Sequence, residues 1–423
     1  MQTSWPHCKG VFQTEMRGIP KRVIPHHAVP RPSLCPSCSR LQLRHSQSLQ
    51  QSQHQQSRRF ANLAPPKPPS AGLAALTSRQ LLSVTGPDAT KFLHGIVTAN
   101  ITGPDGLPRT DAFYSGFLNA TGRVVHDLFI YPFRGQALSA LSTQYHPDED
   151  GYLIEADARE MARFAKLINR YKLRAKVIVR VLSQDEASVW QAWDDSPAGF
   201  SDIIPSESRI ILRDPRAPGL GHRLVQIGSR APEIDLETST QDAYTIRRYL
   251  HGVPEGQDEI LREQALPLES NIDMMNGIDF RKGCYVGQEL TIRTKHRGVV
   301  RKRILPCSIY DADKAPPQTL LYEPDCASLE TLTADMIPGE TSIGRYGKRG
   351  RSAGKWLKGV VGNIGLALCR LEIMTDVALP GEQAAATYKP EDEFVLEWGE
   401  EEYKSSVKVK AFVPEWLRSG LAA

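Results

Sequence analysis

The sequence predicts an α+β fold followed by a C-terminal β-barrel-like domain. Up to about residue 303, apolar runs of strand length alternate with short helical patterns, which is typical of sheets covered by helices. Beyond that point short apolar strands are separated by Gly and Pro turns, with few helical periods. The chain has 423 residues, 40% of them hydrophobic and 24% charged, so its length and composition suit a globular protein of two or three domains.

Residues 1–60 have the composition of an organelle transit peptide. They hold nine of the 52 Lys and Arg residues but one acid, Glu15, and are rich in Ser, Gln and His. The sequence Arg58-Arg59-Phe60 before Ala61 resembles a processing site and predicts import into the mitochondrial matrix. The overall charge of +4 comes from this leader, because the rest of the chain carries a net charge of −4. An N-terminal tail without a targeting role is the alternative.

Changes in composition divide the remaining chain. We expect a Pro-rich linker over 61–72, a first subdomain over 73–182, a second over 183–303 and the barrel-like domain over 304–423. The seven cysteines have neither the density nor the spacing of a secreted disulfide framework, which suits a reducing compartment. No stretch approaches the ~18–20 apolar residues that a transmembrane helix needs, so no membrane span is predicted.

Periodicity and turn residues place the elements of the first subdomain. Apolar residues three or four positions apart predict a helix that buries Met161, Phe164 and Ile168. A turn over 119–122 between two apolar runs predicts a β-hairpin. The expected elements are a strand pair over 73–84, a helix over 88–96, strands over 113–118 and 124–133, a helix over 158–171 and a strand over 176–182.

The same signals place the elements of the other two domains. Residues 184–206 resemble a surface connection, although Trp190 and Trp193 indicate that part of it packs, and residues 347–359 resemble a basic Lys/Gly-rich loop. The second subdomain is expected to contain strands over 208–212 and 223–227 and a helix over 242–251. The barrel-like domain is expected to contain strands over 304–310, 341–346, 360–373, 394–398 and 407–413.

Positive charge is concentrated in residues 279–303, which hold eight Lys or Arg residues against Asp279 and Glu289. A net charge of +6 within a mature chain of −4 predicts attraction to an acidic partner face or to an anionic ligand. Binding of nucleic acid is not expected, because only Phe280 and Tyr285 could stack on bases.

A single cysteine, Cys284, lies between two glycines inside this segment, ahead of a run over 288–295 that can be helical. Free N–H groups at the start of that helix, with Lys282 or Arg293 nearby, would favour the thiolate. Cys284 is therefore a candidate nucleophile, redox thiol or soft-metal ligand. The alternative is a small buried side chain in a Gly-rich turn.

Each of these roles needs further groups. A nucleophile needs a base, and only His296 is close in sequence. A redox switch needs a resolving cysteine, and the sequence places neither Cys307 nor Cys369 for that role. An iron-sulfur cluster normally has about four ligands, so Cys284 could contribute only to a cluster shared with another protein.

The motif Lys282-Gly283-Cys284-Tyr285-Val286-Gly287-Gln288-Glu289 is similar to the signature of the YgfZ-type proteins. These proteins are a branch of the folate-binding superfamily that includes the glycine-cleavage aminomethyltransferase. Other family motifs match in register at 84–89, 266–271 and 298–303. The longer segment 249–306 is similar to mitochondrial members that assist iron-sulfur cluster assembly.

The resemblance implies a GcvT/YgfZ-like folate-binding fold with ferredoxin-like α/β subdomains. It further implies action with A-type iron-sulfur carrier proteins to supply [4Fe-4S] proteins, with Cys284 as the ligand of a shared [2Fe-2S] cluster or as a reactive thiol. The alternative is a tetrahydrofolate-dependent aminomethyltransferase in which Tyr244 stacks on the pterin and Asp127 assists the reaction. Lys282 and Arg293 would bind the folate or the partner. No cofactor is expected to bind tightly to the chain alone.

Three positions depart from the transferase pattern. Leu250 stands where transferases have a glutamate that binds the pterin, and His126-Asp127 stands where they have two adjacent aspartates. Arg79 stands where bacterial relatives have a second aromatic residue. The sequence therefore favours a non-catalytic assembly factor on a transferase-like fold.

Overall fold

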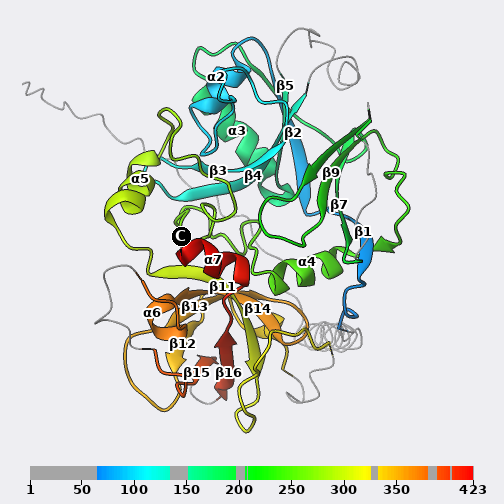
Figure 1. Cartoon of the computed structure of the whole chain (residues 1–423). Coiled ribbons are helices and arrows are strands. Elements are labelled where there is room, and N and C mark those ends of the chain that lie inside the picture. Colours follow the sequence, from blue (N-terminus) through cyan, green and yellow to red (C-terminus); the bar gives the residue numbers. More distant parts are fainter. Residues whose placement is uncertain are drawn as a thin grey trace, which may run out of the picture. The chain divides into compact units, whose positions relative to one another are not determined.

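The computed structural model describes residues 64–133, 151–196, 205–206, 208–324, 332–379, 388–400 and 403–422. The expected leader over 1–60 lies outside the described residues. From Ala64 onward the chain forms one compact unit. This unit contains two five-stranded sheets and a closed six-stranded barrel (Figure 1).

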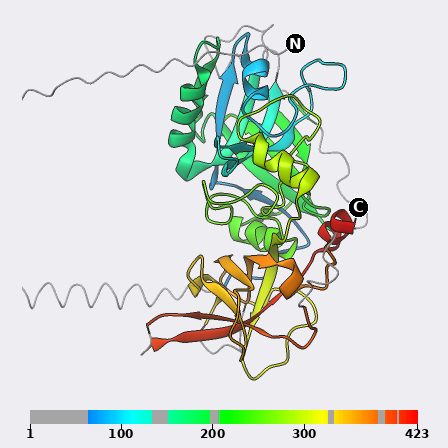
Figure 2. The same ribbon diagram turned by 90° about the vertical axis from the view of Figure 1, so that its left-hand side faces the viewer.

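The first sheet has the strand order β3-β4-β5-β2-β6, and all its neighbouring strands are antiparallel. Two helices cover its outer face and bury Leu93, Phe164 and Ile168 against it (Figure 2). The hairpin and both helices confirm the prediction, whereas β5 was not predicted. The elements are β2 (Arg79–Thr85), α2 (Ala89–His94), β3 (Phe113–Leu118), β4 (Val124–Phe133), β5 (Gly151–Asp157), α3 (Met161–Lys172) and β6 (Ile178–Val181).

The second sheet has the strand order β10-β1-β7-β9-β8 and packs against the inner face of the first sheet. Leu81 and Phe129 of the first sheet share one hydrophobic core with Val189 and Val225 of the second. Helix α4 begins after Thr240, whose side chain accepts a hydrogen bond from the backbone N–H of Ala243 at 3.1 Å. The elements are β1 (Ala71–Ala75), β7 (Ala187–Asp194), β8 (Arg209–Arg213), β9 (His222–Ile227), β10 (Thr238–Ser239) and α4 (Gln241–Leu250).

Two predictions about these sheets are wrong. The strand pair expected over 73–84 is two strands in different sheets, since β1 pairs with β7 and β10 while β2 pairs with β5 and β6. The surface connection expected over 184–206 contains β7, the middle strand of the second sheet. Trp193 of β7 is fully buried, and Gln191 beside it is buried because it bonds within the core. Because a polar residue occupies this buried position, the sequence of β7 lacks the regular alternation of apolar and polar residues that identifies a strand.

The C-terminal domain is a closed barrel with the strand order β11-β14-β13-β12-β15-β16, as the sequence predicted in outline. The basic loop expected over 347–359 ends earlier, because residues 354–359 form β13 and pair with β12 and β14. The elements are β11 (Lys302–Tyr310), β12 (Ser342–Arg345), β13 (Gly354–Gly359), β14 (Ile364–Arg370), α6 (Leu371–Met374), β15 (Phe394–Trp398), β16 (Ser405–Ala411) and α7 (Glu415–Ala422).

Residues 279–287, which we name the Cys284 loop, lead into α5 (Gln288–Arg297). The Lys282 ammonium fixes this loop to the end of α2 by donating hydrogen bonds to the carbonyl oxygens of His94, Val97 and Ala99 at 2.7, 2.7 and 3.0 Å. On its other side the loop touches the β3–β4 turn. A Cβ atom at Gly287, whose φ is +78°, would lie 2.2 Å from a backbone oxygen of that turn.

We expect Lys282→Met to destabilise the protein by about 1–3 kcal/mol, because it leaves buried carbonyl oxygens without their donor. Burial lowers the pKa of Lys282 from 10.5 to about 8, although Asp279 opposes the shift. Between these pH values the unfolded chain binds more protons than the folded chain, so the contribution of Lys282 to stability increases with pH. Urea unfolding of both proteins across this range should show the difference widening.

The matched control is Lys91→Met, because Lys91 is exposed on α2. Its unfolding free energy should stay close to that of the wild type. A difference between wild type and Lys282→Met that is independent of pH would contradict the assigned pKa direction.

The barrel core makes a second prediction about stability. Gly365 of β14 faces the buried indole of Trp356, and a Cβ atom at Gly365 would lie 2.3 Å from that ring. Gly365→Ala should therefore cost about 1–3 kcal/mol through overpacking. Calorimetric unfolding measures this cost against Gly350→Ala, where no atom lies within 4 Å of the new Cβ. Equal effects of the two substitutions would refute the packing assignment.

Candidate functional site

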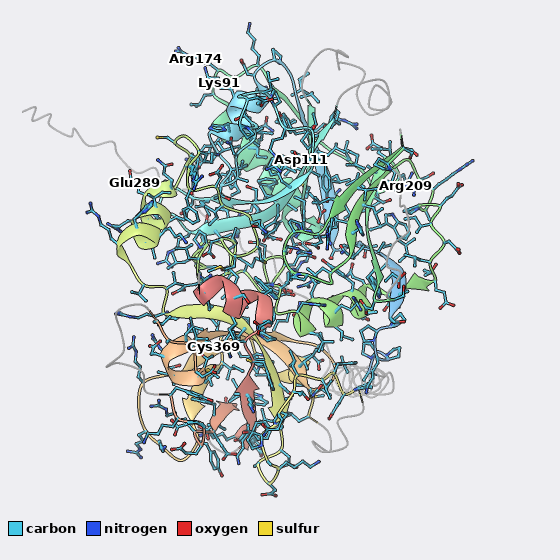
Figure 3. All side chains as sticks on the ribbon, viewed as in Figure 1. Lys91, Asp111, Arg174, Arg209, Glu289 and Cys369 are labelled. Atoms are coloured by element: carbon cyan, nitrogen blue, oxygen red, sulfur yellow. The ribbon has the colours of Figure 1, made fainter. Side chains whose placement is uncertain are left out.

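The Cys284 thiol is exposed to solvent. The alternative of a small buried side chain is therefore wrong. Cys307 and Cys369, the other cysteines in the part of the chain that the structure describes, are fully buried inside the barrel with their Sγ atoms 3.9 Å apart. Figure 3 shows Cys369 in the barrel, on a different part of the molecule from α5. Neither buried thiol can join Cys284 at one site.

An imidazole lies beside the Cys284 loop. His94 ends α2, and its Nε2 atom would lie 3.3 Å from a Cβ atom placed on Gly283, the neighbour of Cys284. Burial and the charge of Lys282 lower the pKa of His94, which favours the neutral ring. The sequence suggested His296 as the nearby histidine, but that residue lies in the last turn of α5. His94 was missed because it comes from a segment about 190 residues earlier.

Most of the predicted positive charge lies on the surface around this loop. Arg281 and Arg293 are exposed, and so is Lys295 on α5. Figure 3 shows Glu289 at the start of the same helix, on the outer edge of the molecule. Lys282 differs from these cations because its ammonium is directed to backbone carbonyls. Arg293 is thus accessible to a ligand or partner, whereas Lys282 holds the loop in place.

Tyr244 and Asp127, the residues expected at a folate site, lie instead in a buried ionic network between the two sheets. The network links four arginines with five carboxylates from strands, loops and α4. Its charged members are Arg79, Arg216, Arg223, Arg248, Asp127, Glu155, Asp214, Glu255 and Glu259. All nine are buried. The sequence indicated several of these residues only as parts of family motifs.

The environment of Tyr244 does not fit a stacked pterin. The side chain is 2% exposed, and its hydroxyl donates to Glu255 at 2.7 Å while accepting from Arg216 and Arg223 at 2.9 and 2.7 Å. The guanidinium groups of Arg223 and Arg248 lie 5.4 and 5.3 Å from the ring centroid. The chain's own cations therefore occupy the space around the ring.

Asp127 is equally inaccessible. It is fully buried, pairs with Arg79 at 3.2 Å, and accepts a hydrogen bond from the backbone N–H of Gly256 at 3.1 Å. These contacts give the carboxylate a structural role. Arg79, the departure from the family's aromatic residue, also pairs with Glu155 at 2.7 Å.

The arginines lower the pKa of two carboxylates of the network, Glu255 and Glu155. Burial alone would raise the pKa of Glu255, but the charges of Arg223, Arg216 and Arg248 hold it well below its ordinary value. The pKa of Glu155 is lowered in the same way, by Arg223 and Arg79 against burial. Glu155 and Glu255 are thus paired with arginines of the chain itself.

A cavity of about 110 Å³ lined by Arg79, Arg248 and Glu255 opens onto this network. Asp258 forms ion pairs with Arg159 and Lys358 at its wall. Pockets for drug-sized ligands usually measure about 300–1,000 Å³. This cavity is therefore smaller than the usual site for a ligand of folate's size.

The described helices include none that is long and apolar enough to cross a membrane. Among the described His, Cys, Asp and Glu residues, no group of three or more could hold a metal ion. The candidate functional site is thus the exposed thiol of Cys284, a group that can react or bind a metal. His94 and the cations of the loop and α5 lie around it.

Comparisons with known proteins agree with this structure. The family model described as the CAF17 C-terminal β-barrel domain matches residues 301–419. The glycine cleavage system aminomethyltransferase T from Bartonella henselae has a TM-score of 0.54 with 12% identity, over 82% of this chain and 87% of that protein. This likeness shows the fold alone. It confirms the predicted folate-enzyme fold with a C-terminal barrel.

Two relatives are similar over most of their length. A protein from Pyricularia oryzae named iron-sulfur cluster assembly factor IBA57 homolog, mitochondrial, is 56% identical over 359 residues, which cover 84% of this chain and 86% of the relative. A protein of the same name from Neurospora crassa is 49% identical and covers 82% of this chain and 81% of its own. With this identity over this length, the chain belongs to the family of the mitochondrial iron-sulfur cluster assembly factors named IBA57.

Proposed function

We propose that this mitochondrial protein is an iron-sulfur cluster assembly factor that uses Cys284 as one ligand of a [2Fe-2S] cluster shared with an A-type carrier protein. The cluster would pass on to [4Fe-4S] proteins in the matrix. The observation on which the proposal rests is the exposed Cys284 thiol on a loop fixed by hydrogen bonds. The chain that presents it is 56% identical to a protein named as an assembly factor.

The ligand requirement supports a shared cluster. A cluster of this kind is normally held by about four ligands, most often Cys thiolates. Cys307 and Cys369 are enclosed in the barrel, so they cannot complete the set at Cys284. A partner protein would supply the other ligands. The thiol loses its proton when it binds iron, and the proton leaves to solvent or to a nearby base such as His94.

The fixed position of the loop also supports the proposal. Lys282 holds one end to α2, and the backbone N–H of Val286 donates to the carbonyl of Gly95 at 3.0 Å. A ligand on a restrained loop loses less conformational entropy when the complex forms. The exposed cations of the loop and α5 would attract an acidic carrier face and speed the encounter at low salt.

The alternative function, aminomethyl transfer from tetrahydrofolate, has less support. The residues that would act on the folate, Tyr244 and Asp127, are buried and engaged by arginines. We therefore propose that the folate-enzyme fold serves as a scaffold here.

Replacing Cys284 tests the main proposal. When the mature chain is mixed with an A-type carrier under anaerobic iron-sulfur reconstitution, the wild type should give a coloured heterocomplex, and Cys284→Ala should not. Size-exclusion chromatography with visible absorption measures this. Because the side chain is exposed, the unfolding free energy should change by no more than about 0.5 kcal/mol.

The control is Cys369→Ala, which removes a buried barrel thiol and should retain the coloured complex. The proposal that Cys284 is a cluster ligand is wrong if Cys284→Ala forms the same complex and restores [4Fe-4S] enzymes in cells that lack the protein.

Titration with tetrahydrofolate tests the alternative. We expect no saturable change in tryptophan fluorescence, because arginines fill the space around Tyr244. Saturable binding that Tyr244→Phe weakens, in a variant shown to be folded, would reinstate the folate site.

A further inference from the structure

A cavity lies beside α5, on the side of the helix that faces the barrel. It measures about 270 Å³ and opens between α5, residues 266–269 and the ends of β11 and β14, and we name it the α5–barrel pocket. Figures 1 and 2 show the chain running from α5 into β11, the first strand of the barrel. The pocket is thus built by the helix that follows the Cys284 loop together with the C-terminal domain.

The inner wall of the pocket is mainly apolar. Leu266, Leu290 and Val299 line it, and all three are half-buried. Thr291 is the exception. Its side chain is 2% exposed, and its hydroxyl has no hydrogen-bond partner among the described residues. By contrast, the hydroxyl of Thr294 donates to the carbonyl of Leu290 at 2.8 Å. Since a buried polar group is normally satisfied, the Thr291 hydroxyl offers a hydrogen bond to an occupant of the pocket.

The rim of the pocket is basic. Arg351 and Arg370 enter it from the barrel, and Arg370 is held by a hydrogen bond from its Nε to the carbonyl of Ser352 at 2.9 Å. Burial and the nearby charge of Arg351 lower the pKa of Arg370, although Glu372 and Glu269 oppose the shift. Arginine remains charged in proteins, so an anion placed between the two guanidinium groups would reduce the repulsion between them.

The other charged residues of the lining are Lys302, Glu269 and Arg301. Lys302 lies 3.6 Å from Glu269, which forms an ion pair with it. The five charged lining side chains therefore carry a net charge of +3, to which Arg351 and Arg370 contribute +2. A ligand that fits must combine a carboxylate for the arginines with an apolar group for the inner wall.

We propose that the α5–barrel pocket receives a short apolar, carboxylate-bearing segment of the protein that meets Cys284. The inference rests on the proposed function and specifies the second contact of that complex. Helix α5 begins four residues after Cys284 and contributes Leu290 and Thr291 to the pocket, so a protein bound at the thiol lies next to it. The cavity is smaller than the about 300–1,000 Å³ usual for drug-sized ligands, which favours an inserted side chain or chain end.

The test measures the affinity of the full mature chain for the cluster-free A-type carrier by calorimetry. Arg351→Glu reverses one rim charge, and Thr294→Trp fills the pocket from its half-buried edge. Each should weaken binding at least about tenfold, which corresponds to 1.4 kcal/mol. The matched control is Arg349→Glu, which makes the same charge change at an exposed position in the same loop outside the pocket lining. It should change the affinity by less than about threefold.

Thermal unfolding checks whether each variant is folded. If Thr294→Trp does not fold, the result for Arg351→Glu alone decides the outcome. The pocket assignment is overturned if Arg351→Glu binds the carrier as tightly as Arg349→Glu. It is also overturned if sodium hexanoate occupies the pocket without competing with the carrier. In those cases a wild-type complex that depends on Cys284 leaves the proposed function intact. If the wild type forms neither a complex nor a shared cluster, the proposed function itself fails.

Discussion

The arrangement of the two sheets depends on the ion pairs buried between them. Arg223 of the second sheet pairs at 2.7 Å with Glu155 of the first and with Glu255 of the connecting loop. Removing one member of such a network leaves an uncompensated buried charge, which typically costs about 3–5 kcal/mol. These ion pairs therefore hold the two sheets together. They also fix the loop over 252–259 to both sheets.

This constraint also decides where chemistry can take place. Tyr244, the residue expected to stack on a pterin, is buried, and its hydroxyl is bonded by Arg216 and Arg223. The exposed candidate for reaction or metal binding is Cys284, in a loop between the end of α2 and the β3–β4 turn. The interior thus stabilises the scaffold, and the surface of α5 with its preceding loop is where we propose that a partner protein binds.

Local patterns were predicted from the sequence where neighbouring residues suffice to define them. The face of α3 that contains Phe164 and Ile168, the β3–β4 hairpin and α5 all follow from spacing and turn residues. Strand β7 was missed because its buried Gln191 interrupts the apolar alternation. That residue is buried because it bonds to Arg223, which lies 32 residues further along the chain. The pairing of β1 with β7 is likewise set by contacts distant in sequence.

The sequence alone was enough to predict the family and the barrel and to single out Cys284 as a candidate, because an eight-residue motif and a local charge excess depend only on adjacent residues. The tertiary structure decided what the charges do. It directs Lys282 to the carbonyls of α2, surrounds Tyr244 with arginines, and joins Thr291 and Arg351 in one pocket. Ion pairs and cavities form between residues far apart in the chain. Their existence depends on how the sheets and the barrel pack, which periodicity does not encode.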